Sequence, residues 1–345
     1  MANVERSSLP LITIGIVVLN REWIINKMLK SLSIQNYPHD KIYVVIADGK
    51  SKDNTVEIAR KILESSDFMG YNLISVDCSI PEGRNICIEN MRGDFLFFWD
   101  SDVIMGQDGL MRSVEAFFKE KIDIVSADGI PIFVYDIDEL DTIINDTRSS
   151  SEFINGNKIC MSHSVLMGHT LVSRRVLDVL RFDPDLTYDE DVYFCIIARE
   201  KGFKIAVDKR ILAYDINMRK KGHSDIYVDM PLQRAIKGLR KKAKVHVLID
   251  GFNINWRKMI SFFLTNKRFL FYLGYIPTII VSIYGLFTYS YLSLAFPTYI
   301  MSFTLWQIKR RGMIRGLKSV LRSIIIGMPI TLFLIYYFII YSTKK

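Results

Sequence analysis

Residues 95–103 read FLFFWDSDV, an apolar run that ends in two acidic residues separated by one serine. Such a run of bulky apolar and aromatic residues is typical of a strand that is buried on both faces of a sheet. Asp100 and Asp102 follow this strand directly, at the position where open α/β sheets bind their ligands. These residues alone leave two interpretations open. Either the acids bind a cation that carries a substrate, or they cap the turn that follows.

The rest of the first 210 residues alternates between strand and helix patterns. Short apolar runs predict strands, and apolar residues at helical spacing predict helices between them. The predicted strands are residues 11–20, 41–49, 71–77 and 94–100, and the predicted helices are residues 22–34, 53–63, 83–93, 109–120 and 190–202. This alternation predicts an α/β fold with a mainly parallel sheet. The polar stretch 136–157 lacks a clear period and is predicted to be a loop over a site.

Further polar residues are expected at the same edge of the sheet. Asp48 closes the predicted strand 41–49, and Asn20 closes the strand 11–20. Carboxylates at such an edge are hard oxygen ligands suited to Mg²⁺ or Mn²⁺, and these ions usually hold substrate phosphates. The Asp-x-Asp pattern occurs four times in the chain, so this prediction depends on the buried strand that precedes Asp100.

Three charged residues at helix starts are also candidates. Arg84 begins the helix before the Asp100 strand, where it would face a phosphate or form a surface salt bridge. Glu190 and Asp191 open the helix 190–202, and the helix dipole favours carboxylates there in any protein. These two acids therefore supply either a general base or a plain helix cap.

The last third of the chain is strongly apolar. Residues 269–308 contain no charged residue, and one helix of that length would extend about 60 Å, roughly twice the hydrocarbon thickness of a bilayer. We therefore expect a membrane domain over residues 269–345. Its predicted spans are residues 269–287, 290–308 and 323–343. The basic amphipathic segments 231–268 and 309–322 are expected to lie in the membrane surface, with solvated helices as the alternative.

Charge divides the chain in the same way. Residues 231–345 carry 18 Lys and Arg against a single acid, Asp250, whereas the whole chain has a net charge of only +8. The part before residue 231 is therefore acidic, which argues against nucleic acid as its partner. A basic segment beside apolar spans is typical of the cytoplasmic face of a membrane and its anionic lipids. We expect a multi-pass cell-membrane protein whose first 230 residues face the cytoplasm.

Several motifs, in order along the chain, resemble the family 2 glycosyltransferases of the GT-A fold. The motifs are VVLNRE (17–22), IYVVIADGKSKDNT (42–55), GRNICIENMRGDFLFFWDSDV (83–103) and FDPDLTYDEDVYFCIIAREKGFKI (182–205). The resemblance covers most of the first 210 residues. It implies that residues 1–230 form a Rossmann-like GT-A catalytic domain.

The resemblance also implies a nucleotide-sugar donor, UDP- or GDP-linked, and a divalent metal ion, Mg²⁺ or Mn²⁺. The donor-binding residues that it implies are Asn20, Glu22, Asp48, Arg84 and Asp100. Asp102 and Asp100 would contact the metal ion, and the pair Glu190 and Asp191 would supply the general base, with Asp191 preferred. The implied reaction is an inverting displacement, in which an acceptor oxygen attacks the anomeric carbon from the side opposite the nucleoside diphosphate.

One segment bears on the acceptor. MRKKGHSDIY (218–227) partly resembles the Arg-x-x-Gly-x-Ser segment of polyprenyl-phosphate sugar synthases, which would place Arg219, Lys220 and Lys221 against an acceptor phosphate. Asp225 stands where that motif usually continues with Lys, so a solvated basic turn is the alternative. The expected acceptor is polyprenyl or dolichyl phosphate, or a lipid-linked glycan.

Two other functions stay open for such a domain. Processive polysaccharide synthases share it, but they typically carry a Gln-x-x-Arg-Trp motif that this sequence lacks. A non-catalytic membrane protein that binds a nucleotide sugar is the other alternative, because fold alone does not fix activity.

Overall fold

The chain folds into two compact units. The structure is a computed structural model. It describes residues 9–134, 136–138, 140, 142, 159–186, 189–218, 267–288, 290–327, 329, 332–333 and 336. The first unit comprises residues 1–184 and 190–221, and the second comprises residues 185–189 and 222–345.

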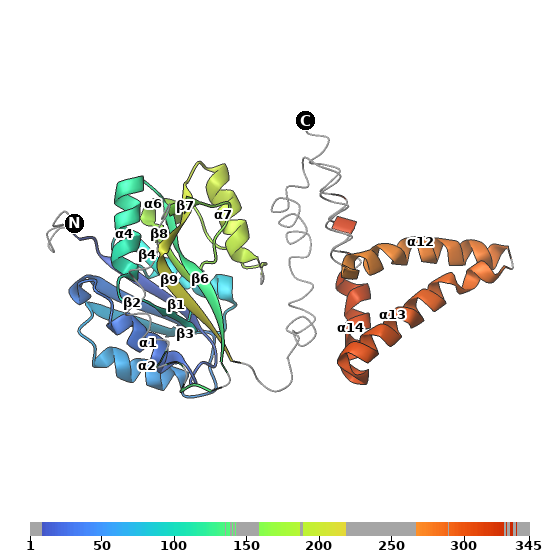
Figure 1. Cartoon of the computed structure of the whole chain (residues 1–345), viewed down its shortest axis with the longest axis horizontal. Helices are drawn as coiled ribbons and strands as arrows, with labels where there is room; N and C mark the ends of the chain where they lie inside the picture. The colour runs from blue at the N-terminus through green and yellow to red at the C-terminus, as the bar shows by residue number, and fades with distance from the viewer. Residues whose placement is uncertain are drawn as a thin grey trace. The chain divides into compact units, whose positions relative to one another are not determined.

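The first unit is built on a nine-stranded sheet (Figure 1). Its strands are β1 Ile12–Val18, β2 Ile42–Asp48, β3 Gly70–Ser75, β4 Phe95–Trp99, β5 Val103–Met105, β6 Ile124–Val134, β7 Ile159–Met161, β8 His169–Ser173 and β9 Ile205–Met218. They are ordered β3-β2-β1-β4-β8-β6-β9-β5, and β7 pairs with β9. β3, β2, β1 and β4 are parallel, β8 runs antiparallel to β4 and β6, and β6 and β9 are again parallel.

Helices cover both faces of the sheet. They are α1 Ile25–Ser33, α2 Thr55–Glu64, α3 Ile80–Glu89, α4 Gly109–Glu120, α6 Arg174–Leu177 and α7 Glu190–Glu200. Phe97 and Trp99 of β4 pack into one core with residues of α1, α2 and α4. Leu96 and Phe98 pack into the other core with residues of α3, α6 and α7. The FLFFW run is therefore buried on both faces because alternate side chains of a strand point to opposite sides.

The strands and helices predicted before residue 121 are all present, with boundaries that shift by a few residues. The helix α3 is shifted at both ends, because it runs from Ile80 to Glu89 rather than from residue 83 to residue 93. Ser79 and Glu82 form a capping box there, and Pro81 fits the first turn, where its missing N–H costs nothing. The prediction of a mainly parallel sheet holds for β3-β2-β1-β4 and not for β8. The predicted loop 136–157 lies almost entirely outside the described residues.

The second unit is helical where it is described. Its elements are α12 Lys267–Phe287, the 3₁₀ turn η4 Tyr291–Leu294, α13 Ala295–Arg311, α14 Met313–Arg322 and the π-helical turn η5 Ser323–Gly327. α12, α13 and α14 fall on the predicted segments 269–287, 290–308 and 309–322, whereas most of the predicted span 323–343 and nearly all of the segment 231–268 lie outside the described residues. Within the described part of the chain, no helix is both long and apolar enough to cross a membrane. The expectation of three membrane spans is therefore not confirmed.

Candidate active site

Asp48 is fixed at the carboxyl end of β2. It is fully buried, and its Oδ2 accepts a hydrogen bond of 2.6 Å from the Ser75 hydroxyl at the end of β3. Its Oδ1 accepts a hydrogen bond of 3.1 Å from the backbone N–H of Ser51. Two neighbouring strands and the following loop therefore hold this carboxylate in one orientation.

Asn20 and Glu22 hold the same loop from the end of β1. The Asn20 side chain accepts the Lys52 N–H at 2.9 Å, and the Glu22 carboxylate accepts the Asn54 N–H at 3.0 Å. Both side chains are exposed, and Asn20 has a left-handed φ of 53°, which asparagine tolerates better than most residues. The loop after Asp48 is thus tied to the end of β1. This brings together the sequence-predicted residues Asn20, Glu22 and Asp48.

Arg84 joins two other parts of the predicted site. Its guanidinium is almost fully buried, with Nη1 at 2.6 Å from Glu190 Oε1 and Nη2 at 3.5 Å from Asp100 Oδ1. Its Nε has no hydrogen-bond partner, and the guanidinium lies 5.4 Å from the centre of the Phe182 ring. Burial alone would lower the pKa of Arg84, but Asp100 and Glu190 outweigh it and raise the pKa. Arg84 therefore connects the end of β4 to the start of α7.

Asp100 also rests against Gly168, which directly precedes β8. Its backbone N–H donates to Gly168 O at 2.7 Å. Gly168 packs so closely on Asp100 that a Cβ at this position would overlap the Asp100 carboxylate. A side chain at position 168 would therefore displace Asp100, and only glycine leaves it room.

Asp102 is held in an environment that opposes its charge. Burial, followed by repulsion from Asp100, raises the pKa of Asp102 to about 6, and Asp215 adds to the repulsion. The Arg21 guanidinium lies 3.4 Å from Asp102 Oδ2 and offsets part of it. Burial and the charge of Asp100 also raise the pKa of Asp215. Arg21 thus only partly offsets the burial and the repulsion that raise the pKa of Asp102.

A bound divalent cation would supply further positive charge beside Asp102. Among the residues that the structure describes, no three His, Cys, Asp or Glu side chains are grouped to hold a metal ion by themselves. Mg²⁺ commonly uses one or two protein carboxylates and completes its coordination with substrate phosphates and water. The hard oxygen donors of Asp100 and Asp102 suit such an ion, and its charge would offset the burial and the repulsion that raise the pKa of Asp102.

The two acids at the start of α7 differ in their surroundings. Glu190 is buried against Arg84, and burial raises its pKa although Arg84 opposes the shift. Asp191 is partly exposed, and its Oδ1 accepts the Val192 N–H at 2.7 Å. Glu190 is therefore occupied by an ion pair inside the unit, while Asp191 lies nearer to solvent, where an acceptor would arrive.

Sequence reasoning missed three residues of this edge: Arg21, Asp215 and His169. Arg21 lies between the two predicted residues Asn20 and Glu22, so the VVLNRE motif was a signal for it. Asp215 reaches the site only because β9 pairs antiparallel with β5, with Asp215 opposite Val103. His169 lies opposite Trp99 at the end of β4, and no local pattern in the sequence pointed to it.

His169 is buried and held on one side only. Its Nδ1 lies 3.0 Å from the Ser126 hydroxyl, and its Nε2 has no hydrogen-bond partner. Burial lowers the pKa of His169, so the ring is neutral at pH 7. The predicted acceptor-phosphate residues Arg219, Lys220 and Lys221 lie outside the described residues, so nothing here places them near this edge.

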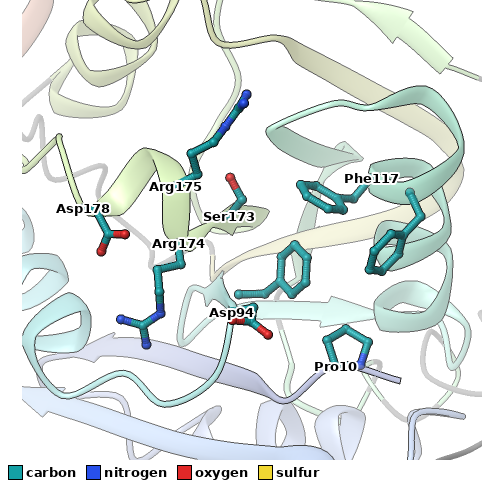
Figure 2. Close-up of a pocket in the computed structure, with 9 residues that line it drawn as sticks. Pro10, Asp94, Phe117, Ser173, Arg174, Arg175 and Asp178 are labelled. Atoms are coloured by element: carbon teal, nitrogen blue, oxygen red, sulfur yellow. The ribbon is translucent and has the colours of Figure 1, made fainter. Parts of the chain in front are cut away.

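A pocket of about 420 Å³ lies at the opposite edge of the sheet (Figure 2). Pro10 and Asp94 line it and precede β1 and β4, whereas the candidate acids follow the carboxyl ends of the strands. Phe117 of α4 and Arg174 of α6 complete its walls (Figure 2). This pocket is therefore separate from the residues described above.

The sequence of the chain is similar to those of known glycosyltransferases. Residues 13–176 match the family described as Glycosyl transferase family 2. Glycosyltransferase AglE of Haloferax volcanii is 32% identical over 119 residues, which cover 34% of this chain and 39% of that protein. The Methanococcus voltae dolichyl N-acetyl-alpha-D-glucosaminyl phosphate 3-beta-D-2,3-diacetamido-2,3-dideoxy-beta-D-glucuronosyltransferase is 24% identical over 214 residues, 59% of this chain and 65% of that protein. The chain thus spans less than two thirds of each of these relatives.

A solved structure shares the fold. The mannosyltransferase PcManGT from Pyrobaculum calidifontis, in complex with GDP-Man and Mn²⁺, matches with a TM-score of 0.50 and 15% sequence identity. The match covers 99% of this chain and 88% of that one. At this identity the likeness shows the fold, and it agrees with the GT-A fold that the sequence motifs predicted.

Proposed function

We propose that this chain, whose residues 13–176 match the family described as Glycosyl transferase family 2, transfers a sugar from a nucleotide-diphosphate donor to a hydroxyl of a lipid-linked glycan. The observation that carries the proposal is the buried Arg84, which pairs with Glu190 at 2.6 Å and with Asp100 at 3.5 Å. This ion-pair network sets the acids after β4 and the acids of α7 at a fixed separation. A donor site on one side and a proton acceptor on the other are what a glycosyl transfer needs.

The donor is proposed to bind where the loop after Asp48 meets the end of β1. Asp48, Asn20 and Glu22 shape this corner, and Asp100 and Asp102 would hold Mg²⁺ or Mn²⁺ together with the donor diphosphate. When bound, the ion would offset negative charge on the departing nucleoside diphosphate. PcManGT, which shares the fold, holds GDP-Man and Mn²⁺ in its structure.

Asp191 is the proposed general base. Its partly exposed carboxylate would take the proton of the acceptor hydroxyl while the oxygen attacks the anomeric carbon, with inversion. Glu190 keeps its ion pair with Arg84 and orients the first turn of α7. An acceptor that is already ionised, such as polyprenyl phosphate, would not need this proton transfer. A working base at Asp191 therefore favours a hydroxyl acceptor.

The acceptor class rests on two further observations. The Methanococcus voltae relative is named for its action on dolichyl N-acetyl-alpha-D-glucosaminyl phosphate. The second unit of this chain has long apolar stretches and a large excess of Lys and Arg, which suit a protein that works at a membrane. We propose a multi-pass cell-membrane protein with its catalytic domain on the cytoplasmic side. Polyprenyl phosphate is the second candidate acceptor, through Arg219, Lys220 and Lys221.

The test uses the full chain in mild detergent with Mn²⁺ and a panel of radiolabelled UDP- and GDP-sugars. Polyprenyl phosphate and polyprenyl phosphate that already carries one sugar are offered in parallel, and label is counted in the organic phase. The proposal expects label only on the lipid that carries a sugar. Label on polyprenyl phosphate alone would identify a lipid-phosphate sugar synthase instead. Donor binding without label on either lipid would favour a polysaccharide synthase or a non-catalytic binder. Transfer to further glycan acceptors would then identify the synthase.

The Asp191→Asn variant tests whether Asp191 is the general base. We expect it to lower kcat by about 10²–10⁴-fold with a hydroxyl acceptor, the usual contribution of a general base. Asp178→Asn, an exposed acid at the opposite edge of the sheet, is the matched control and should keep full activity. If Asp191→Asn keeps full activity on the lipid-linked sugar, the base assignment is wrong.

A further inference from the structure

Helix α14 packs through small residues and Val320 rather than through its largest apolar side chains. Gly316, Val320 and Ser323 are buried. A Cβ at Gly316 would come within 2.7 Å of the Ile308 Cα, so α14 lies directly on the backbone of α13. Ser323 follows the helix, and its hydroxyl lies 2.6 Å from the hydroxyl of Tyr275 in α12. The side of α14 that faces its neighbours is therefore narrow and uses small residues.

Most of the large apolar side chains of α14 point away from this packing. Met313, Ile314, Leu317 and Leu321 are between 50% and 70% exposed. At about 100° per residue, these four cover a sector of about 100° beside the packed side. We call them the α14 apolar face. The sequence predicted one apolar stripe that also included Val320, but only Val320 is used for packing within the described part of the unit.

Basic residues border the α14 apolar face. Lys318 is exposed and begins the next sector around the helix, about 40° beyond Ile314. Lys309 and Arg310 are exposed at the end of α13, just before α14. Residues 251–345 contain no acidic residue, so no acid of this part of the sequence balances the charge. An occupant of this surface must accept apolar side chains and carry negative charge beside them.

We propose that the α14 apolar face lies in the headgroup region of a bilayer that contains anionic lipids. Such a surface buries apolar side chains at the acyl boundary while Lys and Arg reach the lipid phosphates along the edge. An acidic protein is less suited, because it would have to present a matching apolar surface as well as its charge. This contact concerns how the second unit meets the membrane, and it does not depend on the proposed glycosyl transfer.

The experiment follows the chemical accessibility of the face in the full chain. A Leu317→Cys variant is placed in vesicles of phosphatidylcholine alone or of phosphatidylcholine with one third phosphatidylglycerol. Reaction with a membrane-impermeant maleimide is followed by mass spectrometry of the fragment that holds residue 317. Phe118→Cys, an exposed apolar position on α4 of the other unit, is the matched control. We expect labelling at 317 to be at least tenfold slower than at 118 in the anionic vesicles, and faster again at high salt.

Three results would overturn the proposal. Equal labelling at 317 and 118 in anionic vesicles would show that the α14 apolar face is exposed to water. Equal protection in both vesicle types would mean that the basic residues do not select anionic lipid. Protection that is lost when the protein is diluted would place a second copy of the chain on the face. Lys318→Glu provides an independent reading, because it should weaken recovery with anionic vesicles in flotation and leave the apolar side chains intact.

Discussion

Asp102 is the residue at which charge and burial are most clearly opposed. Its pKa, raised to about 6, lies above the ordinary value of 3.8, so the folded state binds the proton more tightly than the unfolded state. Its contribution to stability is therefore complete below pH 4 and is lost as the pH rises through 6. We expect the metal-free chain to lose up to about 3 kcal/mol of unfolding free energy over this range through Asp102. Denaturant unfolding from pH 4 to pH 7 measures it, and Asp102→Asn should flatten the curve.

Asp102→Asn should also reduce the stabilisation that ligand binding gives to the folded chain. Mn²⁺ with a nucleoside diphosphate should raise the melting temperature of the wild-type chain, because binding to the folded state alone stabilises it. The melting temperature of Asp102→Asn should rise little when Mn²⁺ and the nucleoside diphosphate are added. Asp215→Asn is the comparison, since it removes a repelling charge without removing Asp102. An equal shift in wild type and Asp102→Asn would contradict the metal assignment.

Gly168 limits the space around Asp100. A Cβ there would overlap the Asp100 carboxylate, so Gly168→Ala should displace Asp100 from Arg84 and from the proposed metal position. We expect KM for the donor to rise by about tenfold and Mn²⁺ binding, measured by calorimetry, to weaken similarly, as a loss of about 1.4 kcal/mol at the ligand would give. Gly15→Ala is the control, because its Cβ would crowd the side chain of Cys87 in the core instead.

Sequence patterns located most single residues of the candidate site but not their partners. Asp48, Asp100 and Asp102 were expected at the strand ends, and they share one edge of the sheet because β2 and β4 both run parallel to β1. The pairing of Arg84 with Glu190 joins residues 106 positions apart, and no local spacing encodes it. His169 was missed for the same reason, since only the pairing of β8 with β4 brings it to Trp99.

At the scale of elements, the start of α7 depends on α3. Arg84 lies in α3 and Glu190 begins α7, and both are buried where they meet. Removing one partner of a buried ion pair leaves an uncompensated charge, whereas removing both does not. We expect Arg84→Met to lower the unfolding free energy by about 3 kcal/mol, and Arg84→Met with Glu190→Gln to recover a clear part of it. Denaturant unfolding of the four proteins of this cycle measures the coupling, and additive losses would show that the pair is not coupled.

Helices and central strands were predictable because their patterns are local. β1, β2 and β4 are nearly continuous apolar runs, which is typical of strands buried on both faces of a sheet. β6 and β9 were missed. From Asp128 onward the side chains of β6 alternate between half-buried and exposed, so this part of the strand has no continuous apolar run to mark it. The antiparallel direction of β8 also has no local signal, because the hydrophobic pattern of a strand is the same whether it pairs parallel or antiparallel with its neighbour.

At the scale of the whole molecule, amino-acid composition alone separates the acidic first part of the chain from the basic second part. The predicted domain boundary at residue 230 rests on this change in charge and stays a prediction. Composition could not predict how α14 packs, because Gly316 and Ser323 carry no apolar signal. The most informative property of α14 is therefore the apolar side that its packing leaves exposed.

The two units lead to a prediction about a shortened chain. The nine-stranded sheet, both of its cores and every described residue of the candidate site lie within residues 9–218. A chain of residues 1–221 should therefore fold, with a single cooperative unfolding transition, and bind a nucleotide sugar with Mn²⁺ within about threefold of the full chain, a difference below 1 kcal/mol. Its transfer to a long-chain lipid acceptor in vesicles should fall by at least about 100-fold, because the second unit no longer concentrates it at the membrane. Transfer to a short, water-soluble analogue of the acceptor should be kept.

A shortened chain that folds but fails to bind the donor would show that the second unit completes the donor site. A shortened chain that keeps full transfer in vesicles would contradict the membrane role proposed for that unit.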